Sequence, residues 1–511
     1  MQIGIEQRDS GNSAREDAAS WPALLSRPLV LGGVWLAVTL AVAVYVLYSV
    51  QAAGIGYPLD DAWIHQTYAR NLAQYGEWSF IPGQPSAGST APLWSLLLAG
   101  SYFLGLPHFA WTFLLGSLSL FALALLGEAL FRAFLPEQRS PFPWAALFLV
   151  GEWHLVWAGV SGMETLLMAA LIMLALLRSA RSRGKDWLLT GALIGLSVWV
   201  RPDGITLLGP AGLTLLLVEP NWRARQRSAL WLAGGLLLLF VPYLLFNLAI
   251  QGSLWPNTFY AKQAEYALER EAPLLLRLSE ELVLPLIGSG LFLLPGFLLF
   301  AWQAVQRKRW AALSAVIWFL GYALLYAMHL PVTYQYGRYF MPAMPVYFVT
   351  GLVGVAVLVA RMRSSRVGWI LARVWVLSTI GLWLGFYVLG AERYAQDVAI
   401  IETEMVAAAK WVGANTPPDA VIAAHDIGAL GYFGQRRLLD LAGLVSPEVI
   451  PFIRDETRIA SWLNAEKANY LVVFSDWYVE LPDGKTVVFE TNGDFSRESG
   501  GSNTVIYQWR P

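Results

Sequence analysis

Apolar runs separated by short polar stretches dominate the chain from residue 28 to about residue 390. Eleven of these runs approach the roughly 20 residues that cross a membrane as a helix. They lie at about 28–50, 109–131, 142–160, 164–178, 187–200, 204–219, 228–251, 281–303, 310–330, 340–360 and 369–390. Several are short, so their helices must extend into the flanks or thin the bilayer. The pattern predicts a polytopic α-helical membrane protein.

Basic residues cluster in alternate connections between these runs. The clusters are Arg132 and Arg139; Arg178, Arg181, Arg183 and Lys185; Arg223, Arg225 and Arg227; Arg307, Lys308 and Arg309; and Arg361, Arg363 and Arg366. The positive-inside rule makes these connections cytoplasmic. The connections between them, which include 51–91, 252–280 and 331–339, are then expected outside. This alternation requires that a shorter apolar piece, 93–104, does not cross, so we predict eleven spans and one re-entrant half-helix.

The two ends of the chain differ from this middle part. Residues 1–27 are polar and predict a cytoplasmic tail, because the run that follows is too long for a signal peptide. Beyond residue 391 a polar helix pattern reaches 415, and Pro417-Pro418 ends it. Short β-like runs follow at 421–424, 470–474, 486–490 and 504–509, with turn residues between them. We predict a transmembrane domain over 28–391 and a small extracytoplasmic α/β domain over 392–511.

Composition agrees with a membrane protein and narrows its chemistry. The 511 residues are 56% hydrophobic and 14% charged, whereas soluble domains are roughly a quarter charged. A net charge of −1 gives no bias toward nucleic acid. The absence of cysteine excludes disulfide and thiol chemistry. The sequence has no Walker-type loop for ATP, no HExxH metalloprotease motif and no G-x-S-x-G elbow.

An aspartate pair follows the first apolar run, in the stretch Tyr57–His65. Asp60 and Asp61 begin a helix-like segment, roughly 60–75, whose amphipathic pattern is typical of a helix lying flat at a membrane surface. His65 lies one turn after Asp61 on the same face. Free N–H groups at a helix start favour ionised carboxylates, which suit a proton acceptor or a ligand of Mg²⁺, Mn²⁺ or Ca²⁺. The alternative is that one Asp only caps the helix.

Two of the other outer connections hold unusual charges. Glu164 stands in a polar break, 161–165, and its alternative role is an ordinary helix-start residue. Arg201 is the basic residue of the tight turn 201–204, against the charge bias of the outer side. Arg201 could also be an anchor that extends toward the membrane surface.

Three further polar motifs are expected on the same side. Asn257, Tyr260 and Lys262 bring together an amide, a phenol and an ammonium just after a span. Arg338 lies between aromatic residues before a Met-Pro helix start. In the tail, His425 and Asp426 are candidate polar groups, although this pair could instead be a turn at the end of a strand.

Taken together, these motifs place carboxylates and separated cations on one side of a membrane. Carboxylates can deprotonate an attacking hydroxyl, and the cations Arg201, Lys262 and Arg338 can stabilise a leaving phosphate. A lipid phosphate would explain the membrane location. The alternative is a transporter or flippase for a lipid-linked sugar, which needs polar groups near the midplane. The spans hold few: Glu128, and Glu152 and His154, which we interpret as packing or lateral-site residues.

Six segments, in order, resemble the GT-C class of membrane glycosyltransferases, and more narrowly the terminal arabinofuranosyltransferases of the mycobacterial cell wall and their bacterial relatives. The segments are YPLDDAWIHQTYARNLAQYGEWSFIPGQPSAGSTAPLWSLLLA at 57–99, SGMET at 161–165, RPDG at 201–204, PNTFYAK at 256–262, YGRYFMPAMP at 336–345 and HDIGALGYFGQRRLLDLAGLVSPE at 425–448.

This resemblance implies a GT-C-like transmembrane domain of about eleven helices with a small C-terminal α/β domain that helps to bind an acceptor. It also implies transfer of a sugar from a polyprenyl-phosphate donor to an acceptor hydroxyl on a glycan, glycolipid or protein, outside the bacterial cytoplasmic membrane. Asp60 or Asp61 would be the base, with Asp60 favoured as nearer the membrane, and the other would orient the acceptor or bind a divalent cation. The remaining implied residues are Lys262, Arg201 and Arg338 near the donor phosphate, and His65, Glu164, Asn257, Tyr260, His425 and Asp426 as acceptor or supporting residues.

Overall fold

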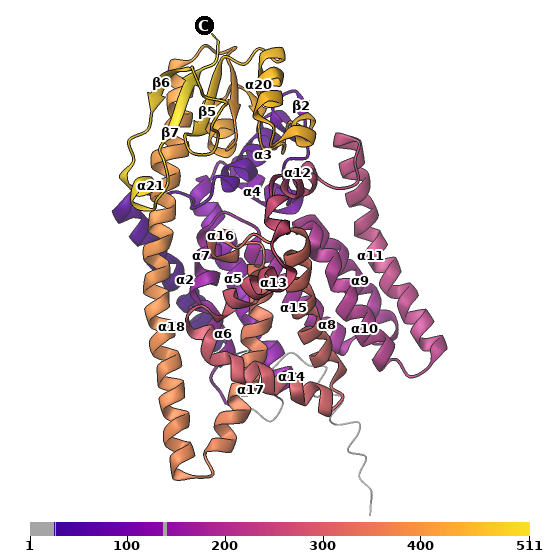
Figure 1. Ribbon diagram of the computed structural model, residues 1–511. Coiled ribbons are helices and arrows are strands. Elements are labelled where there is room, and N and C mark those ends of the chain that lie inside the picture. The colour runs from indigo at the N-terminus through magenta and orange to yellow at the C-terminus, as the bar shows by residue number, and fades with distance from the viewer. Residues whose placement is uncertain (1–24, 26, 136–139, 511) are drawn as a thin grey trace, which may run out of the picture.

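Helices make up most of the molecule, and a five-stranded β-sheet lies at one end of it (Figure 1). The computed structural model describes residues 25, 27–135 and 140–510. The predicted cytoplasmic tail, 1–27, therefore lies almost wholly outside the described residues, as does Arg139.

Seven helical segments in the described part of the chain are long and apolar enough to cross a membrane. They are α2 (Pro28–Ala52), α5 (His108–Phe134), α11 (Trp222–Gln251), Gly288–Gln306 with α14 (Leu294–Gln306), α15 (Trp310–His329), Tyr334–Met362 with α16 (Tyr334–Gly337) and α17 (Met344–Met362), and the run that begins with α18 (Arg366–Ile401). The predicted membrane protein is thus confirmed in type.

The predicted number of eleven spans is not confirmed, because four of the runs form shorter helices. These are α6 (Trp144–Val150) with α7 (Trp153–Val160), α8 (Thr165–Arg181), α9 (Trp187–Val200) and α10 (Leu208–Val218). The predicted half-helix 93–104 is α4 (Pro92–Leu104), of 13 residues. At 1.5 Å per residue it is about 20 Å long, which is less than the hydrocarbon core of a bilayer.

The break between α6 and α7 lies where the side chain of a distant residue approaches the backbone. A Cβ at Gly151 would lie 2.0 Å from the ring of Trp383. Only glycine therefore allows the backbone to approach the ring this closely. The Glu152 carboxylate then accepts the N–H of Leu155 at the start of α7 and lies 2.8 Å from Nδ1 of His154. Both ionisable side chains are buried. Glu152 and His154 therefore support helix packing.

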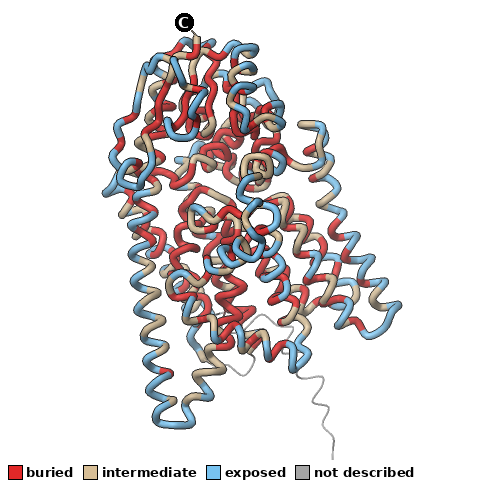
Figure 2. Tube along the Cα trace, in the orientation of Figure 1, coloured by how far each residue is buried: buried red, intermediate tan, exposed pale blue. Residues whose placement is uncertain are grey.

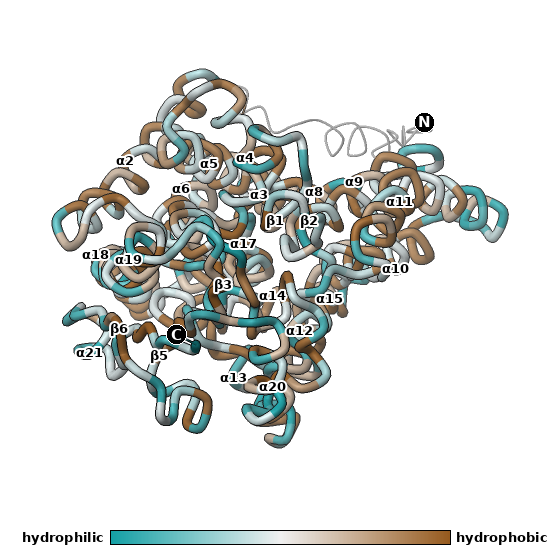
Figure 3. Tube along the Cα trace, turned by 90° about the horizontal axis from the view of Figure 1, so that it is seen from above, coloured by the Kyte–Doolittle hydropathy of each residue, from teal (hydrophilic) through white to brown (hydrophobic). Residues whose placement is uncertain are grey.

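The helical part has two distinct ends (Figure 1). The turn between α10 and α11 and the turn between α17 and α18, which carries Arg361 and Arg363, lie at the end far from the β-sheet. Buried residues concentrate in the middle of the helices and in the sheet, whereas much of α18 is exposed (Figure 2). Viewed from the sheet side, α9, α10 and α11 form a group set to one side (Figure 3). Exposed apolar faces on long helices are expected where lipid surrounds them.

The tail contains the predicted α/β structure, with one strand that the sequence pattern missed. Strands β3 (Val421–Ala424), β5 (Tyr470–Phe474), β6 (Thr486–Glu490) and β7 (Thr504–Gln508) match the predicted runs, and β4 (Arg437–Asp440) is additional. The sheet order is β4-β3-β5-β7-β6, with β4, β3 and β5 parallel and β7 antiparallel to both neighbours. The helices α20 (Glu456–Ala465) and α21 (Asp494–Glu498) complete it.

No break separates the last span from the tail. Helix α18 continues through a wider turn, Glu402–Val406, into α19 (Ala407–Asn415). The boundary that we draw at residue 391 therefore falls inside α18. This continuous helix carries the tail on the helical part (Figure 1).

Helix α3 (Asp61–Tyr75) forms as predicted but does not lie open at a surface. It packs on α4 and on the tail turn Leu430–Gly434. Trp63 contacts Tyr432 and Phe433, with ring centroids 4.8 and 4.7 Å apart. On the polar face, the Gln66 amide donates to Tyr57 and Thr112. The tail therefore covers the apolar face of α3, and α5 provides a partner on its polar face. A position flat at a membrane surface stays a prediction.

Candidate functional site: two adjoining cavities under the tail

The first member of the aspartate pair connects α3 to the tail. Asp60 occupies the residue before α3, but its side chain does not cap that helix. Its carboxylate instead accepts the backbone N–H groups of Gly428 (2.6 Å) and Ala429 (2.8 Å). A Cβ at Gly428 would lie 2.0 Å from the Asp60 carbonyl oxygen. The simple capping alternative is therefore wrong, and glycine is needed for this close approach.

The two aspartates have opposite electrostatic environments. Burial and the neighbouring Asp426 carboxylate raise the pKa of Asp60 to about 8, against the two N–H donors. Burial would also raise the pKa of Asp61, but the charges of Arg338 and Lys262 lower it to about 2. Arg338 forms an ion pair with Asp61. Adjacent carboxyl groups with such different pKa values suit different roles.

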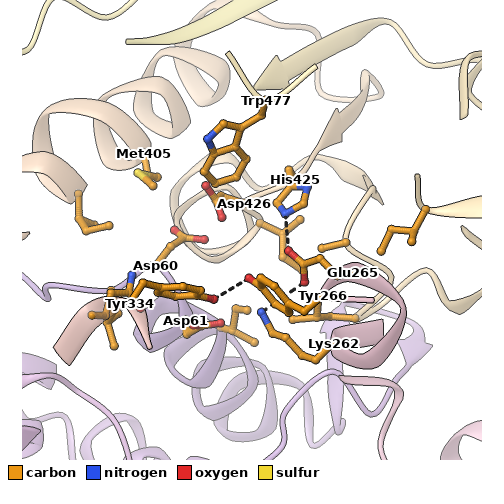
Figure 4. A pocket seen from close by; sticks show the side chains of 18 of the residues that line it. Asp60, Asp61, Lys262, Glu265, Tyr266, Tyr334, Met405, His425, Asp426 and Trp477 are labelled. Atoms are coloured by element: carbon orange, nitrogen blue, oxygen red, sulfur yellow. Dashed lines mark hydrogen bonds and ion pairs between the residues drawn. The ribbon is translucent and has the colours of Figure 1, made fainter. Parts of the chain in front are cut away.

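A cavity of about 670 Å³ lies beside the aspartate pair and is lined by residues of both the helical part and the tail. Figure 4 shows Asp60, Asp61 and Lys262 on one side of it, and Asp426 and Trp477 on the other. We call it the tail-side cavity. Its lining comes from the start of α3, from α12 (Asn257–Glu265), from α16 and from five segments of the tail.

A short polar network closes one side of the tail-side cavity. Nζ of Lys262 lies 3.7 Å from Glu265, one turn further along α12. Glu265 also contacts Nε2 of His425 at 3.2 Å, and Nδ1 of His425 contacts the Tyr478 hydroxyl at 2.8 Å. Burial lowers the pKa of His425, but the Glu265 and Asp426 carboxylates raise it above its usual value. The strand-end turn at 425–426 therefore also supplies two side chains to the cavity.

A second cavity of about 420 Å³ adjoins the first and is lined mainly by residues of the helical part. Trp255, Phe259, Leu325 and Leu330 are among the apolar side chains in its wall. We call it the membrane-side cavity. Its lining shares six residues with the tail-side cavity: Leu59, Asp61, Ile64, Lys262, Arg338 and Leu444. The Asp61–Arg338 ion pair and the Lys262 ammonium thus stand on the wall between the two spaces.

Arg201 and Glu164 lie deeper in the membrane-side cavity. Arg201 is 8% exposed and contacts Asp203 at 3.2 Å and the Tyr326 hydroxyl at 2.8 Å, so it is no membrane-surface anchor. Glu164 precedes α8 without capping it. Its carboxylate lies 3.6 Å from His65 and 3.8 Å from Arg201. Glu164 does stand at a helix start, as the alternative interpretation has it, and its carboxylate also lies among these charges.

The fold brings most, but not all, of the predicted residues to these cavities. Asn257 and Tyr260 line neither one: Asn257 donates to the Leu444 carbonyl, and Tyr260 is 41% exposed. Prediction from sequence missed Glu265. Its position three residues after Lys262 on a helix could have indicated an ion pair between the two. Prediction also missed Trp477, which has no motif around it.

The carboxylates of the aspartate pair are not free to bind a cation. Both oxygens of Asp60 accept backbone N–H groups, and Asp61 is paired with Arg338. No group of three His, Asp or Glu side chains within the described ranges is arranged to hold a metal ion. Oxygen-rich ligand sets are what Mg²⁺ and Ca²⁺ require, so the arrangement does not fit the expected divalent cation.

Comparisons with known proteins bear on the tail and on the fold separately. A family model described as a domain of unknown function (DUF8728) matches residues 393–507. No curated protein sequence matches the chain.

Among solved structures, ArnT from Cupriavidus metallidurans bound to undecaprenyl phosphate is 15% identical with a TM-score of 0.56, covering 94% of this chain and 98% of that one. Its apo state gives 15% and 0.57 with the same coverage. The arabinofuranosyltransferase AftD from Mycobacteria is 14% identical over 93% of this chain and 41% of that one, with a TM-score of 0.46. ArnT is a GT-C glycosyltransferase, and its likeness extends over nearly the whole of both chains. The chain therefore has the fold of the GT-C membrane glycosyltransferases.

Proposed function

We propose that the protein transfers a sugar from a polyprenyl-phosphate donor to the hydroxyl of an acceptor. The observation that carries this proposal is the shared wall of the two cavities, where Asp61, Lys262 and Arg338 meet an apolar space on one side and a polar space on the other. The likeness to a structure of ArnT bound to undecaprenyl phosphate supports the lipid carrier.

The membrane-side cavity suits the donor. Its aromatic and aliphatic wall can cover the first prenyl units, and burial of apolar surface favours this. The phosphate then lies near Lys262 and Arg338, whose charges stabilise the negative charge that develops as it leaves. Arg201 already contacts Asp203, Glu164 and Tyr326. We assign it a supporting role toward the same phosphate from deeper in the cavity.

The tail-side cavity suits the acceptor, and Asp61 suits the base. Asp60 was favoured from sequence, but both of its oxygens accept N–H groups of the tail. Asp61 lines both cavities and is ionised at neutral pH because its pKa is lowered to about 2. A base must be deprotonated and within reach of the hydroxyl. Asp60 then positions the tail over the acceptor, together with Asp426 and His425.

The reaction is a single displacement. The acceptor oxygen attacks the anomeric carbon while its proton passes to the Asp61 carboxylate. The bond from that carbon to the phosphate oxygen breaks, and the electron pair leaves with polyprenyl phosphate. Attack from the side opposite the leaving group inverts the anomeric centre.

Donor binding also activates the base. Arg338 forms an ion pair with Asp61. A donor phosphate competes for the same guanidinium, because Arg binds phosphate as readily as carboxylate. Loss of that partner raises the pKa of Asp61 toward its ordinary value and strengthens it as a base. The ion pair with Arg338 therefore keeps Asp61 a weak base until the donor binds.

The orientation follows from the two ends of the helical part. The basic residues at the start of α11 and around the turn before α18 lie at the end away from the tail (Figure 1). Tail residues contribute to the lining of both cavities. By the positive-inside rule, the tail and the site face outward from a bacterial cytoplasmic membrane. The acceptor is then a molecule of the cell envelope.

The test is release of free polyprenyl phosphate. Purified protein is incubated with a panel of polyprenyl-phosphate sugars and an envelope extract, and the freed carrier lipid is measured. We expect release with at least one sugar and none from the double variant Asp60→Asn/Asp61→Asn, which must still be folded. If that variant retains normal turnover, the assignment of the base is wrong. Movement of the donor across vesicles without release would instead favour the transporter.

A further inference from the structure

One aromatic side chain of the tail is left uncovered inside the tail-side cavity. Trp477 is 48% exposed, more than any other aromatic residue in the described part of the tail, 392–510. It follows β5 and lines the cavity opposite Asp61 and Lys262 (Figure 4). Ligand pockets are commonly lined by aromatic side chains with polar groups beside them, and Trp477 has this position in the tail-side cavity.

The indole is held in place by its neighbours. Its ring centroid lies 4.9 Å from that of His425, at an interplanar angle of 83°, and 5.0 Å from that of Phe474. The loop that follows is fastened to α20, because the Glu456 carboxylate accepts the backbone N–H groups of Val479, Glu480 and Leu481. A group that is already rigid loses little conformational freedom when it binds.

Polar groups surround this apolar surface on the cavity wall. His425, Asp426 and Glu265 lie along one side, and Arg454 lies at the start of α20. The Arg454 guanidinium is exposed and makes no ion pair or hydrogen bond within the described residues. Flat apolar surface with donors and acceptors at its edges is the complement of a sugar ring, which has C–H groups on its faces and hydroxyls at its rim. An acyl chain would leave these surrounding polar groups without partners.

We propose that Trp477 is a stacking platform for a sugar residue of the acceptor, so that the acceptor is a glycan or the glycan part of a glycolipid. This inference rests on the proposed transferase function and names its acceptor class. The sugar on Trp477 places the next unit toward the opposite wall, where Asp61 takes the hydroxyl proton. Arg454 and His425 contact the hydroxyls of the stacked ring.

The test is direct binding of sugars without any donor. Neutral trisaccharides of glucose, galactose, mannose, xylose and arabinose are added separately to the full chain in lipid nanodiscs, because sugar-headed detergents would compete. Saturation-transfer NMR records which ring protons contact the protein. We expect at least one trisaccharide to bind, and the Trp477→Ala variant to weaken its binding at least tenfold. The Trp477→Phe variant should retain part of it, since Phe keeps a flat apolar face.

The matched control is Val479→Ala on the same loop. Val479 is 83% exposed and does not line the cavity, so its variant should bind sugar and release carrier lipid as the wild type does. In turnover assays with an active acceptor, Trp477→Ala should raise the KM for that acceptor at least tenfold.

Two failures are distinguishable. If no trisaccharide binds, or if Trp477→Ala binds as tightly as the wild type, the platform is refuted whatever the donor assay shows. If sugars bind through Trp477 but no polyprenyl-phosphate sugar ever releases its carrier, the transferase is refuted and the sugar site stands. A Trp477→Ala variant that binds sugar normally but associates less with lipid vesicles would identify the indole as a membrane anchor and overturn the proposal.

Discussion

Asp61 and Arg338 are 277 positions apart in the chain and form an ion pair on the wall between the two cavities. The pair joins the start of α3 to the segment between α16 and α17. Neither residue is exposed to bulk water as an ordinary surface ion would be. Four predictions test what this arrangement, the tail and the segment before Arg338 contribute.

The first prediction separates the two aspartates. Asp61→Asn should lower kcat by about 10²–10⁴-fold, the usual contribution of a general base. Asp60→Asn should lower it less, because one N–H contact to the tail can remain. The pH profile of kcat/KM decides between them. A base with a pKa of about 2 stays ionised at every pH above that value, so activity should not fall between pH 8 and pH 5.

The opposite profile would contradict this assignment. Burial raises the pKa of Asp60 to about 8, so Asp60 carries its negative charge mainly above that pH. If Asp60 were the base, activity would rise as the pH increases through 8. That rise would disappear in Asp60→Asn and persist in Asp61→Asn.

The second prediction concerns the guanidinium. Arg338→Gln should lower kcat/KM for the donor by about 10²–10³-fold, through loss of charge at the leaving phosphate. It should also move the acid limb of the pH profile upward, since removal of a positive neighbour raises the pKa of Asp61. The control is Arg437→Gln, which breaks an exposed ion pair with Glu466 on the tail. An equal loss in that control would show that the effect is not specific to the site.

The third prediction concerns the junction between the tail and α3. Gly428→Ala would place a methyl group 2.0 Å from the Asp60 carbonyl oxygen, so the tail must move away from the aspartates. We expect a loss of about 1–3 kcal/mol in stability, typical of overpacking, and a loss of transfer activity. Gly434→Ala is the matched control, because its nearest neighbours lie 3.6 Å or more away. Thermal unfolding and carrier-lipid release measure the two effects.

The fourth prediction concerns strain beside Arg338. Gln335 and Tyr336 both have positive φ angles, of 52° and 61°. A left-handed conformation costs roughly 1–2 kcal/mol in a non-glycine residue, and glycine loses about 0.5–1 kcal/mol of chain entropy. Gln335→Gly should therefore raise the free energy of unfolding by about 0.5 kcal/mol. Thr333→Gly, where φ is −106°, should lower it. A decrease in both variants would show that Gln335 is not strained.

The helices and the tail were largely predictable because their signals are local. Apolar runs of spanning length and alternating strand patterns depend on neighbours within a few residues. The exceptions have tertiary causes. The run 142–160 breaks because Trp383, more than 200 positions away, leaves no space for a side chain at Gly151. Strand β4 was missed because it is a four-residue strand whose only partner in the sheet is β3. Pairing with a separate segment leaves no local pattern in the sequence.

The candidate site was predicted as a list of residues, and its organisation was not. Asp60, Asp61, Lys262 and Arg338 could be named because charges are unusual beside membrane spans. The roles of the two aspartates depend on neighbours from distant segments, Gly428 for Asp60 and Arg338 for Asp61. Lys262 is paired with Glu265 of its own helix. Asn257 and Tyr260 belong to the same motif as Lys262, yet the direction in which a helical residue points excludes them from both cavities.

The sequence by itself determined a membrane protein with a small α/β tail and the chemical types present on its outer connections, because hydrophobicity and charge act residue by residue. Only the tertiary structure decided that there are two cavities, which residues stand between them, and that Trp477 lies opposite the aspartates. Those facts depend on distances between segments up to hundreds of positions apart. Such distances are set by packing of the whole chain, and no local pattern encodes them.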